Sequence, residues 1–135
     1  MKTNCAIPLI AMIAVASLAL PAAAADRMQA GQWAGTTVVG GKTFSSSSCM
    51  GKADVDAMNG DAASVLAYLQ KTIPPGICTL SDVHVSGNQV IYTSSCQGGG
   101  VTSANTVTTT YHGKSFESVD TKGTKSEAKL VGACK

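Results

Sequence analysis

Cysteine placement is the feature that most restricts how this 135-residue chain can fold. The first of five cysteines, Cys5, lies in an N-terminal stretch in which Lys2 precedes the apolar residues 6–20, and Pro21 then leads into four alanines. A charged start, an apolar middle and small residues at the end are typical of a secretory signal peptide. We therefore predict that residues 1–25 are a signal peptide cleaved after Ala25, and that residues 26–135 form a single disulfide-stabilised, β-rich domain.

Removal of the signal leaves an even set of cysteines, which is typical of a disulfide-stabilised exported domain. These are Cys49, Cys78, Cys96 and Cys134. Because zinc sites use closely spaced pairs, which this set lacks, we expect two disulfides, no metal and no cofactor. A lipoprotein would need a cysteine at the cleavage point, and the apolar stretch is shorter than the about 20 residues of a membrane span. We therefore expect a periplasmic or secreted protein with no stable membrane anchor after cleavage.

Turn chemistry between two of the cysteines bears on how they pair. Residues 83–85 and 90–92 are short β-rich runs, and the Ser-Gly-Asn sequence of residues 86–88 separates them. A three-residue loop would place Cys78 opposite Cys96, at a spacing that suits a disulfide. We favour this pairing, and elimination then leaves Cys49 with Cys134.

A two-residue loop over residues 87–88 is the alternative for the same hairpin. It pairs Val85 with Val90 and Val83 with Tyr92, which makes a better apolar face but puts the two cysteines on opposite faces of the hairpin. Only a bulge in one strand would reconcile the two registers.

The rest of the mature chain is dominated by β-rich segments separated by glycine. Further strands are predicted over residues 32–39, 42–49, 101–112, 115–120 and 125–134. One helix is predicted from an N-cap at Asp61 to Ile73, because Val65, Leu66 and Leu69 recur at helical spacing before a Pro-Pro-Gly stop. Residues 53–58 are compatible with a further short helical turn.

These elements predict a mainly β (α+β) fold. We expect a curved antiparallel sheet of about six or seven strands, partly barrel-like, with one packed helix and two disulfides.

Composition excludes several function classes. Charged residues make up 13% of the chain, against about a quarter in an ordinary soluble domain, which argues against a coiled coil. Aromatic residues make up 4%, too few for a base-stacking platform. The lysines that follow residue 113 are interleaved with Glu117, Asp120 and Glu127, so they predict a solvated strand face and no nucleic-acid partner.

Candidate catalytic groups are scarce. His84 and His112 are the two histidines, and neither has a carboxylate at a recognisable spacing. No G-x-S-x-G sequence provides a nucleophile elbow. Asp54 and Asp56 are two positions apart and would not face each other on a helix. We expect no enzyme activity.

Several short segments occur together in a recognisable order. They are Ala30-Gly31-Gln32-Trp33, Cys49-Met50, Cys78, Val85-Ser86-Gly87-Asn88-Gln89-Val90, Tyr92, Cys96, Tyr111-His112-Gly113-Lys114-Ser115-Phe116 and Gly132-Ala133-Cys134. The order resembles that of the small exported bacterial proteins grouped as the domain of unknown function numbered 3617, over essentially the whole mature chain. The resemblance implies the fold and export; since the family has no established activity, it implies no catalytic or binding residue.

A second resemblance involves one loop only. The sequence Thr121-Lys122-Gly123 is similar to part of the Tyr-x-x-x-Thr-Lys-Gly loop of periplasmic inhibitors of c-type lysozyme. Glu117 stands where that loop has tyrosine, with Phe116 one residue out of register. Inhibition of a host hydrolase such as c-type lysozyme is therefore the alternative function.

The leading expectation for function is a non-enzymatic exported protein that is structural, envelope-associated or binds a small ligand. A small apolar ligand would require a concave sheet face lined by Trp33, Val85, Val90 and Tyr92 and left open by the helix. If the helix covers that face, the same side chains are core. The sequence does not identify the ligand, the partner or the oligomeric state.

Overall fold

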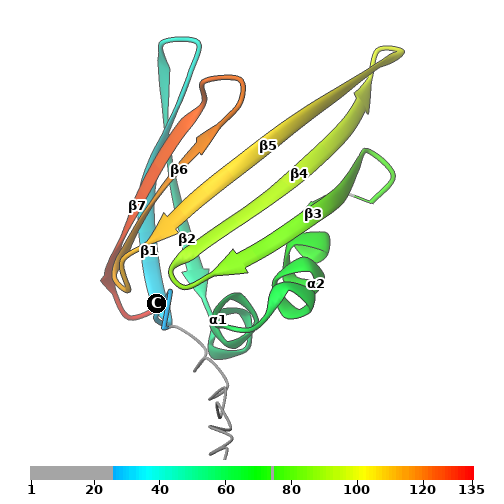
Figure 1. Cartoon of the computed structure of the whole chain (residues 1–135). Helices are drawn as coiled ribbons and strands as arrows, with labels where there is room; N and C mark the ends of the chain where they lie inside the picture. Colours follow the sequence, from blue (N-terminus) through cyan, green and yellow to red (C-terminus); the bar gives the residue numbers. More distant parts are fainter. Residues whose placement is uncertain (1–25, 74) are drawn as a thin grey trace, which may run out of the picture.

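The computed structural model describes residues 26–73 and 75–135, so the predicted signal peptide lies outside the described residues. Seven strands and two helices follow one another along the chain (Figure 1). They are β1 (Gly31–Val39), β2 (Lys42–Met50), α1 (Lys52–Asn59), α2 (Ala62–Thr72), β3 (Cys78–Ser86), β4 (Gln89–Gly98), β5 (Val101–Tyr111), β6 (Ser115–Asp120) and β7 (Lys125–Gly132).

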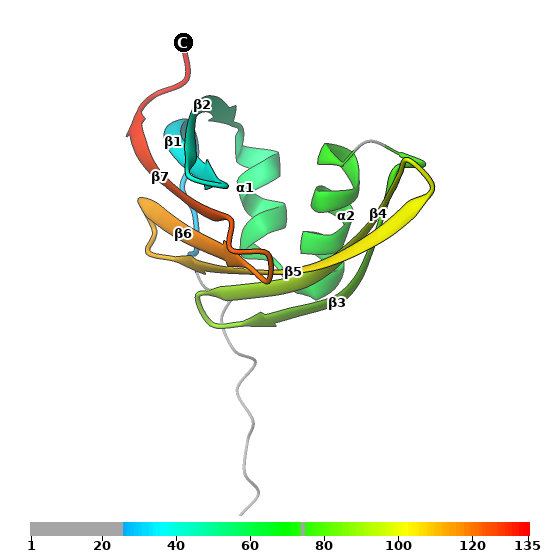
Figure 2. The ribbon, with the colours of Figure 1, turned by 90° about the horizontal axis from the view of Figure 1, so that it is seen from above.

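All seven strands form one antiparallel sheet in the order β2-β1-β7-β6-β5-β4-β3. The sheet curves around both helices, which lie on its concave face, and its two end strands β2 and β3 do not meet (Figure 2). We call the opposite side of the sheet the outer face. The mainly β fold with a curved antiparallel sheet is thus confirmed, as an open sheet with two helices rather than one.

The first hairpin follows directly from its turn. Gly40 and Gly41 both have positive φ, 56° and 79°, which two-residue hairpin turns require and glycine provides without strain. The register then runs without interruption from Val39 opposite Lys42 to Gly31 opposite Met50.

The β3–β4 hairpin contains both of the registers that the sequence left in conflict. Cys78 pairs with Cys96 at one end and Val85 pairs with Val90 at the other, with a register shift between Ser81 and His84. Asp82 lies in this shift with a φ of 54°, the type of backbone distortion that characterises a β-bulge. Val83 lies within the bulge, so its predicted pairing with Tyr92 is wrong.

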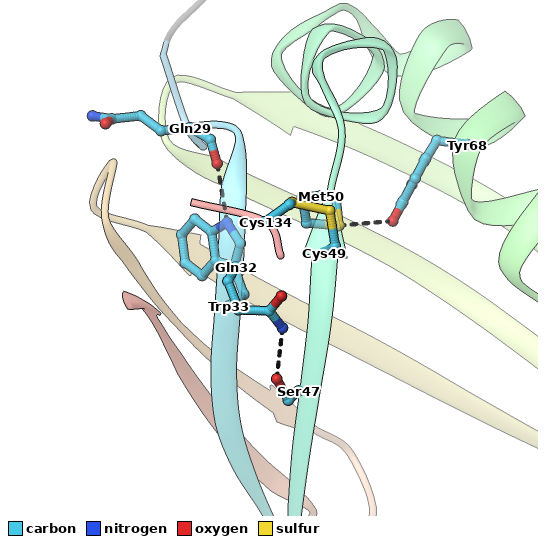
Figure 3. Close-up of a disulfide and its surroundings, with 8 residues drawn as sticks. All are labelled: Gln29, Gln32, Trp33, Ser47, Cys49, Met50, Tyr68 and Cys134. Carbon is cyan, nitrogen blue, oxygen red and sulfur yellow. Dashed lines mark hydrogen bonds between the residues drawn. A yellow bond between two sulfur atoms is a disulfide. The ribbon is translucent and has the colours of Figure 1, made fainter. Parts of the chain in front are cut away.

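One disulfide joins two directly opposed strands, and the other joins a strand to the segment after β7. The hairpin disulfide joins Cys78 to Cys96 with a Cα–Cα distance of 4.0 Å. The long-loop disulfide joins Cys49 at the end of β2 to Cys134, with a Cα–Cα distance of 5.4 Å. Because β1 lies between β2 and β7, the tail that follows β7 passes β1 to reach Cys49 (Figure 3).

The two helices supply one side of the core. Asp61 caps α2 by accepting a hydrogen bond from the backbone N–H of Ser64 at 2.9 Å, as predicted for this position. α1 extends the short helical turn expected over residues 53–58 to a helix of 8 residues. In the described part of the chain, neither helix is long and apolar enough to cross a membrane.

The core lies between the helices and the concave face. Its buried hydrophobic residues are Met28, Trp33, Met50, Val55, Met58, Val65, Val90 and Tyr111. They come from β1, β2, β4, β5, both helices and the segment before β1, so the core forms only when the whole domain is assembled.

A buried arginine fastens the segment before β1. Arg27 is 3% exposed, and its guanidinium donates to the carbonyl oxygens of Met58 (2.8 Å), Gly87 (3.0 Å) and Gly60. Two of these carbonyls, those of Met58 and Gly60, lie at the C-terminal end of α1, where unpaired carbonyls favour a positive charge. Burial lowers the pKa of Arg27 from its ordinary value. One side chain thus connects the N-terminal segment, the α1–α2 junction and the β3–β4 turn.

Candidate functional site

The four residues proposed to line a ligand face are brought together by the fold, but beneath the helices. Trp33 and Val90 are 3% and 1% exposed, and Val85 and Tyr92 are partly buried and pack against the same cluster. Val65 of α2 is fully buried in this cluster. Trp33 and Val90 are therefore core side chains, and Val85 and Tyr92 lie at the margin of the core.

The polar atoms around Trp33 are already paired. Its indole N–H donates to the carbonyl of Gln29 at 3.0 Å, and the hydroxyl of Tyr68 donates to Met50 Sδ at 3.4 Å (Figure 3). Its ring lies 5.8 Å from that of Phe116, which in turn lies 5.6 Å from Tyr111. Edge and offset packing of this kind stabilises aromatic clusters, so Trp33 serves packing at this position.

Beyond the core, the concave face carries small polar side chains that bond to one another. Thr37 and Ser126 hydroxyls lie 2.9 Å apart, and Thr109 donates to Ser118 at 3.0 Å. Tyr92 packs against the core cluster, and burial raises the pKa of its hydroxyl group. Because these hydroxyl groups bond to one another, this part of the concave face forms a polar margin of the core.

The outer face, in contrast, has a hollow across β1, β6 and β7. Two cross-strand rows of side chains form it, because alternate residues of a strand share a face. One row is Val38, Lys125 and Val119, and the other is Thr36, Glu127 and Glu117. The hollow has a volume of about 440 Å³, and we call it the outer groove.

A second depression continues the outer groove towards the edge of the sheet. It has a volume of about 380 Å³ and shares Thr36 and Glu127 with the first. Ala34, Ser45 and Lys129, whose side chains share the outer face with Thr36, also line it. The groove therefore extends across β2, β1, β7 and β6 on one face of the sheet.

The chemistry of the outer groove is mixed. Val38 and Val119 are 38% and 48% exposed, so the hollow presents two apolar side chains to solvent. Glu117 and Glu127 lie directly opposite each other, an arrangement of like charges that destabilises a strand pair. Within residues 26–73 and 75–135, neither Glu127 nor Lys125 forms an ion pair. The groove thus offers apolar surface beside charges that the fold does not use.

One histidine adjoins this groove. His112 Nε2 lies 3.8 Å from Glu117 Oε1, and both side chains are largely exposed. The spacing of the two residues in the sequence did not suggest this contact, because it is formed across the β5–β6 turn. His84 is exposed on β3. In the part of the chain that the structure describes, no cluster of three or more His, Cys, Asp or Glu side chains suits a metal ion.

The Thr-Lys-Gly sequence lies in the β6–β7 turn. Asp120 accepts hydrogen bonds from the backbone N–H groups of Lys122 and Thr124, both at 2.9 Å, and Gly123 has a φ of 84°. The Lys122 ammonium donates to Ser103, and Thr121 donates to Asn105. Much of this short motif is thereby explained by turn formation.

A family model covers nearly all of the described domain. The match runs over residues 28–134 and bears the description protein of unknown function (DUF3617). The chain belongs to this family. No curated protein and no solved structure gives a significant match. The matched range includes all seven strands of this DUF3617 protein and both of its disulfides.

The outer groove was missed in the sequence because its members come from separate parts of the chain. The alternation in residues 115–129 showed a solvated, mixed-charge face, and this face carries Glu117, Lys125 and Glu127. What no local pattern showed is that β1 pairs with β7, which brings Val38 and Thr36 alongside these charges.

Proposed function

We propose that this DUF3617 protein is an exported, non-enzymatic binding protein of the bacterial envelope, and that the outer groove is its binding surface. The proposal is carried by the exposed Val38 and Val119, which share one hollow with charged side chains. Two of these, Lys125 and Glu127, form no ion pair within the described part of the chain. A ligand or envelope component with an apolar part and a polar or charged part fits such a surface, because the apolar part would cover the valines while the charges at the rim orient it.

Export is part of the same proposal. The two disulfides support it, since structural disulfides persist in oxidising compartments and are rare in the cytosol. The signal-peptide pattern of residues 1–25 supports it from the sequence. Export and cleavage after Ala25 would deliver residues 26–135 to the periplasm or the medium.

Native mass spectrometry of the protein purified from its own periplasm tests both parts. We expect a mass that begins at Asp26, contains two disulfides and carries a non-covalently bound component. Four free thiols in the exported protein would contradict the disulfide argument for location.

Two matched variants locate the bound component. Val119→Lys places a charge in the outer groove, whereas Val101→Lys makes the same change at an exposed valine of β5 outside the groove. The component should be lost with Val119→Lys and retained with Val101→Lys. A protein that carries no component, or one that Val119→Lys still retains, would refute the groove as the binding surface.

Inhibition of c-type lysozyme is a second candidate, supported by the exposed position of Lys122 in the β6–β7 turn. In this case the purified domain would slow lysozyme turnover, and Lys122→Ala would remove the effect. An absence of inhibition at about micromolar concentration, a level at which specific inhibitor complexes form, would end this candidate.

A further inference from the structure

The two edges of the sheet differ in how they are protected. β3, at one edge, contains the bulge at Asp82, carries that charged residue in its middle, and packs against α2. Bulges, charges and covering helices are the devices by which natural proteins prevent an edge strand from pairing with another chain.

The other edge lacks these devices. β2 has nine residues, keeps an unbroken register with β1, and is exposed at every position from Lys42 to Cys49. It contains no proline, and its single charged residue is at its first position. On its free side, no strand of the described chain pairs with it. An edge strand of this length, with an unbroken register and its one charge at the end, presents unpaired backbone groups to any further strand.

We propose that β2 pairs with β2 of a second copy of this chain, in an antiparallel, two-fold symmetric arrangement that joins the two sheets. In a two-fold strand pair, the residue at the axis faces the same residue of its partner. That position therefore excludes charged and bulky side chains. The middle of β2 is a run of four serines, Ser45 to Ser48, so any register centred there meets this requirement.

Charge placement also fits a second copy. With Ser46 at the axis, Lys42 of one copy lies opposite Met50 of the other, so the two lysines are at opposite ends of the strand pair. No like charges then face each other, which would otherwise oppose pairing. Phe44, which is 56% exposed, lies opposite Ser48 of the second copy and gains a neighbouring strand to cover it.

Sedimentation velocity of the disulfide-bonded chain over a concentration series tests the inference. Ser46→Lys and Ser46→Asp each place like charges at the axis, and each should raise the dimer dissociation constant at least about fivefold. An equal mixture of the two variants should restore dimers, because opposite charges then meet at the axis. Ser81→Lys and Ser81→Asp make the same changes at an exposed position of β3 and should leave the dissociation constant unchanged.

The mixture separates a lost contact from a lost fold, since misfolded variants would not regain dimers when combined. Dimers of the unmodified chain, weakened by each Ser46 variant and restored by the mixture, would establish the edge. A chain that remains monomeric throughout the series, Ser46 variants that dimerise as strongly as the unmodified chain, or a mixture that stays monomeric would overturn the proposal. Sedimentation velocity measures dimerisation of the Ser46→Lys variant, whereas native mass spectrometry measures ligand retention by Val119→Lys. The dimer proposal can therefore fail while the proposed binding function stands.

Discussion

Replacing Arg27 with alanine should destabilise the domain more than any other single change to a charged residue considered above. The guanidinium makes three hydrogen bonds to backbone carbonyls. Among the residues that the structure describes, Arg27 is the one charged residue that is buried. Of the three bonds, the one to Met58 is buried and the other two are partly buried.

The expected loss follows from that difference in burial. A hydrogen bond from a charged donor contributes about 1.5–3 kcal/mol, and a buried carbonyl that loses its partner costs about the same. Water can replace the partner at Gly60 and Gly87, so these two bonds contribute less, about 0.5–1 kcal/mol each. The sum is a decrease of about 2.5–5 kcal/mol in the free energy of unfolding for Arg27→Ala, a large part of the about 5–15 kcal/mol of a typical domain.

Urea unfolding of residues 26–135 with intact disulfides provides the measurement, and Trp33 provides the signal because it is the one tryptophan and is buried. Arg27→Lys keeps the charge but not the planar set of donors, so it should fall between the alanine variant and the unmodified chain. Lys129→Ala, which removes an exposed cation, is the control and should change stability by less than about 0.5 kcal/mol. A loss below about 1 kcal/mol for Arg27→Ala, or full stability in Arg27→Lys, would refute the reasoning.

Three further predictions concern stability. Replacing both cysteines of the long-loop disulfide with serine should lower the free energy of unfolding by about 4.5 kcal/mol, and the same change to the hairpin disulfide should lower it by about 3 kcal/mol. The difference arises because the first disulfide closes a loop of 85 residues and the second a loop of 18; urea unfolding should rank the two variants in this order. Burial raises the pKa of Tyr111, so its contribution should be complete below about pH 10, the unfolded pKa, and decline as the pH rises towards the folded pKa; Tyr111→Phe should flatten this decline in unfolding curves measured at successive alkaline pH values. Gly35→Ala should lower stability by about 1–3 kcal/mol, because the new Cβ would lie 2.5 Å from the carbonyl oxygen of Glu127. Gly98→Ala, with open space around its Cβ, should be close to neutral when both variants are compared by urea unfolding.

Features with local causes were predictable from the sequence. The Gly40-Gly41 turn, the Asp61 cap and the β6 boundaries are determined by a few adjacent residues, and the structure agrees with each. The predicted pairing of Cys78 with Cys96 is correct, but the three-residue loop from which it was predicted is not, because Ser86 pairs with Gln89 and the register shift between Ser81 and His84 brings the two cysteines opposite each other.

Features that depend on distant contacts were not predictable. The bulge at Asp82 resolves a conflict between two registers, and the sequence indicated the conflict but not its position. α1 is a complete helix, rather than a single turn, where Val55 and Met58 meet the core. The outer groove needs β1 beside β7, a pairing between the two ends of the domain. Local patterns carry no information about such a contact.

The long-loop disulfide also determines how the domain would respond to force. Cys134 follows the last strand of the domain, and its partner Cys49 lies 23 positions after Asp26. A pull on the two ends of the oxidised domain is therefore transmitted through the sulfur bridge, and only the segment before Cys49 can extend, by about 80 Å of chain. After reduction the same pull would release about 380 Å. The helices and five of the seven strands are thus mechanically bypassed for as long as this single bond is intact.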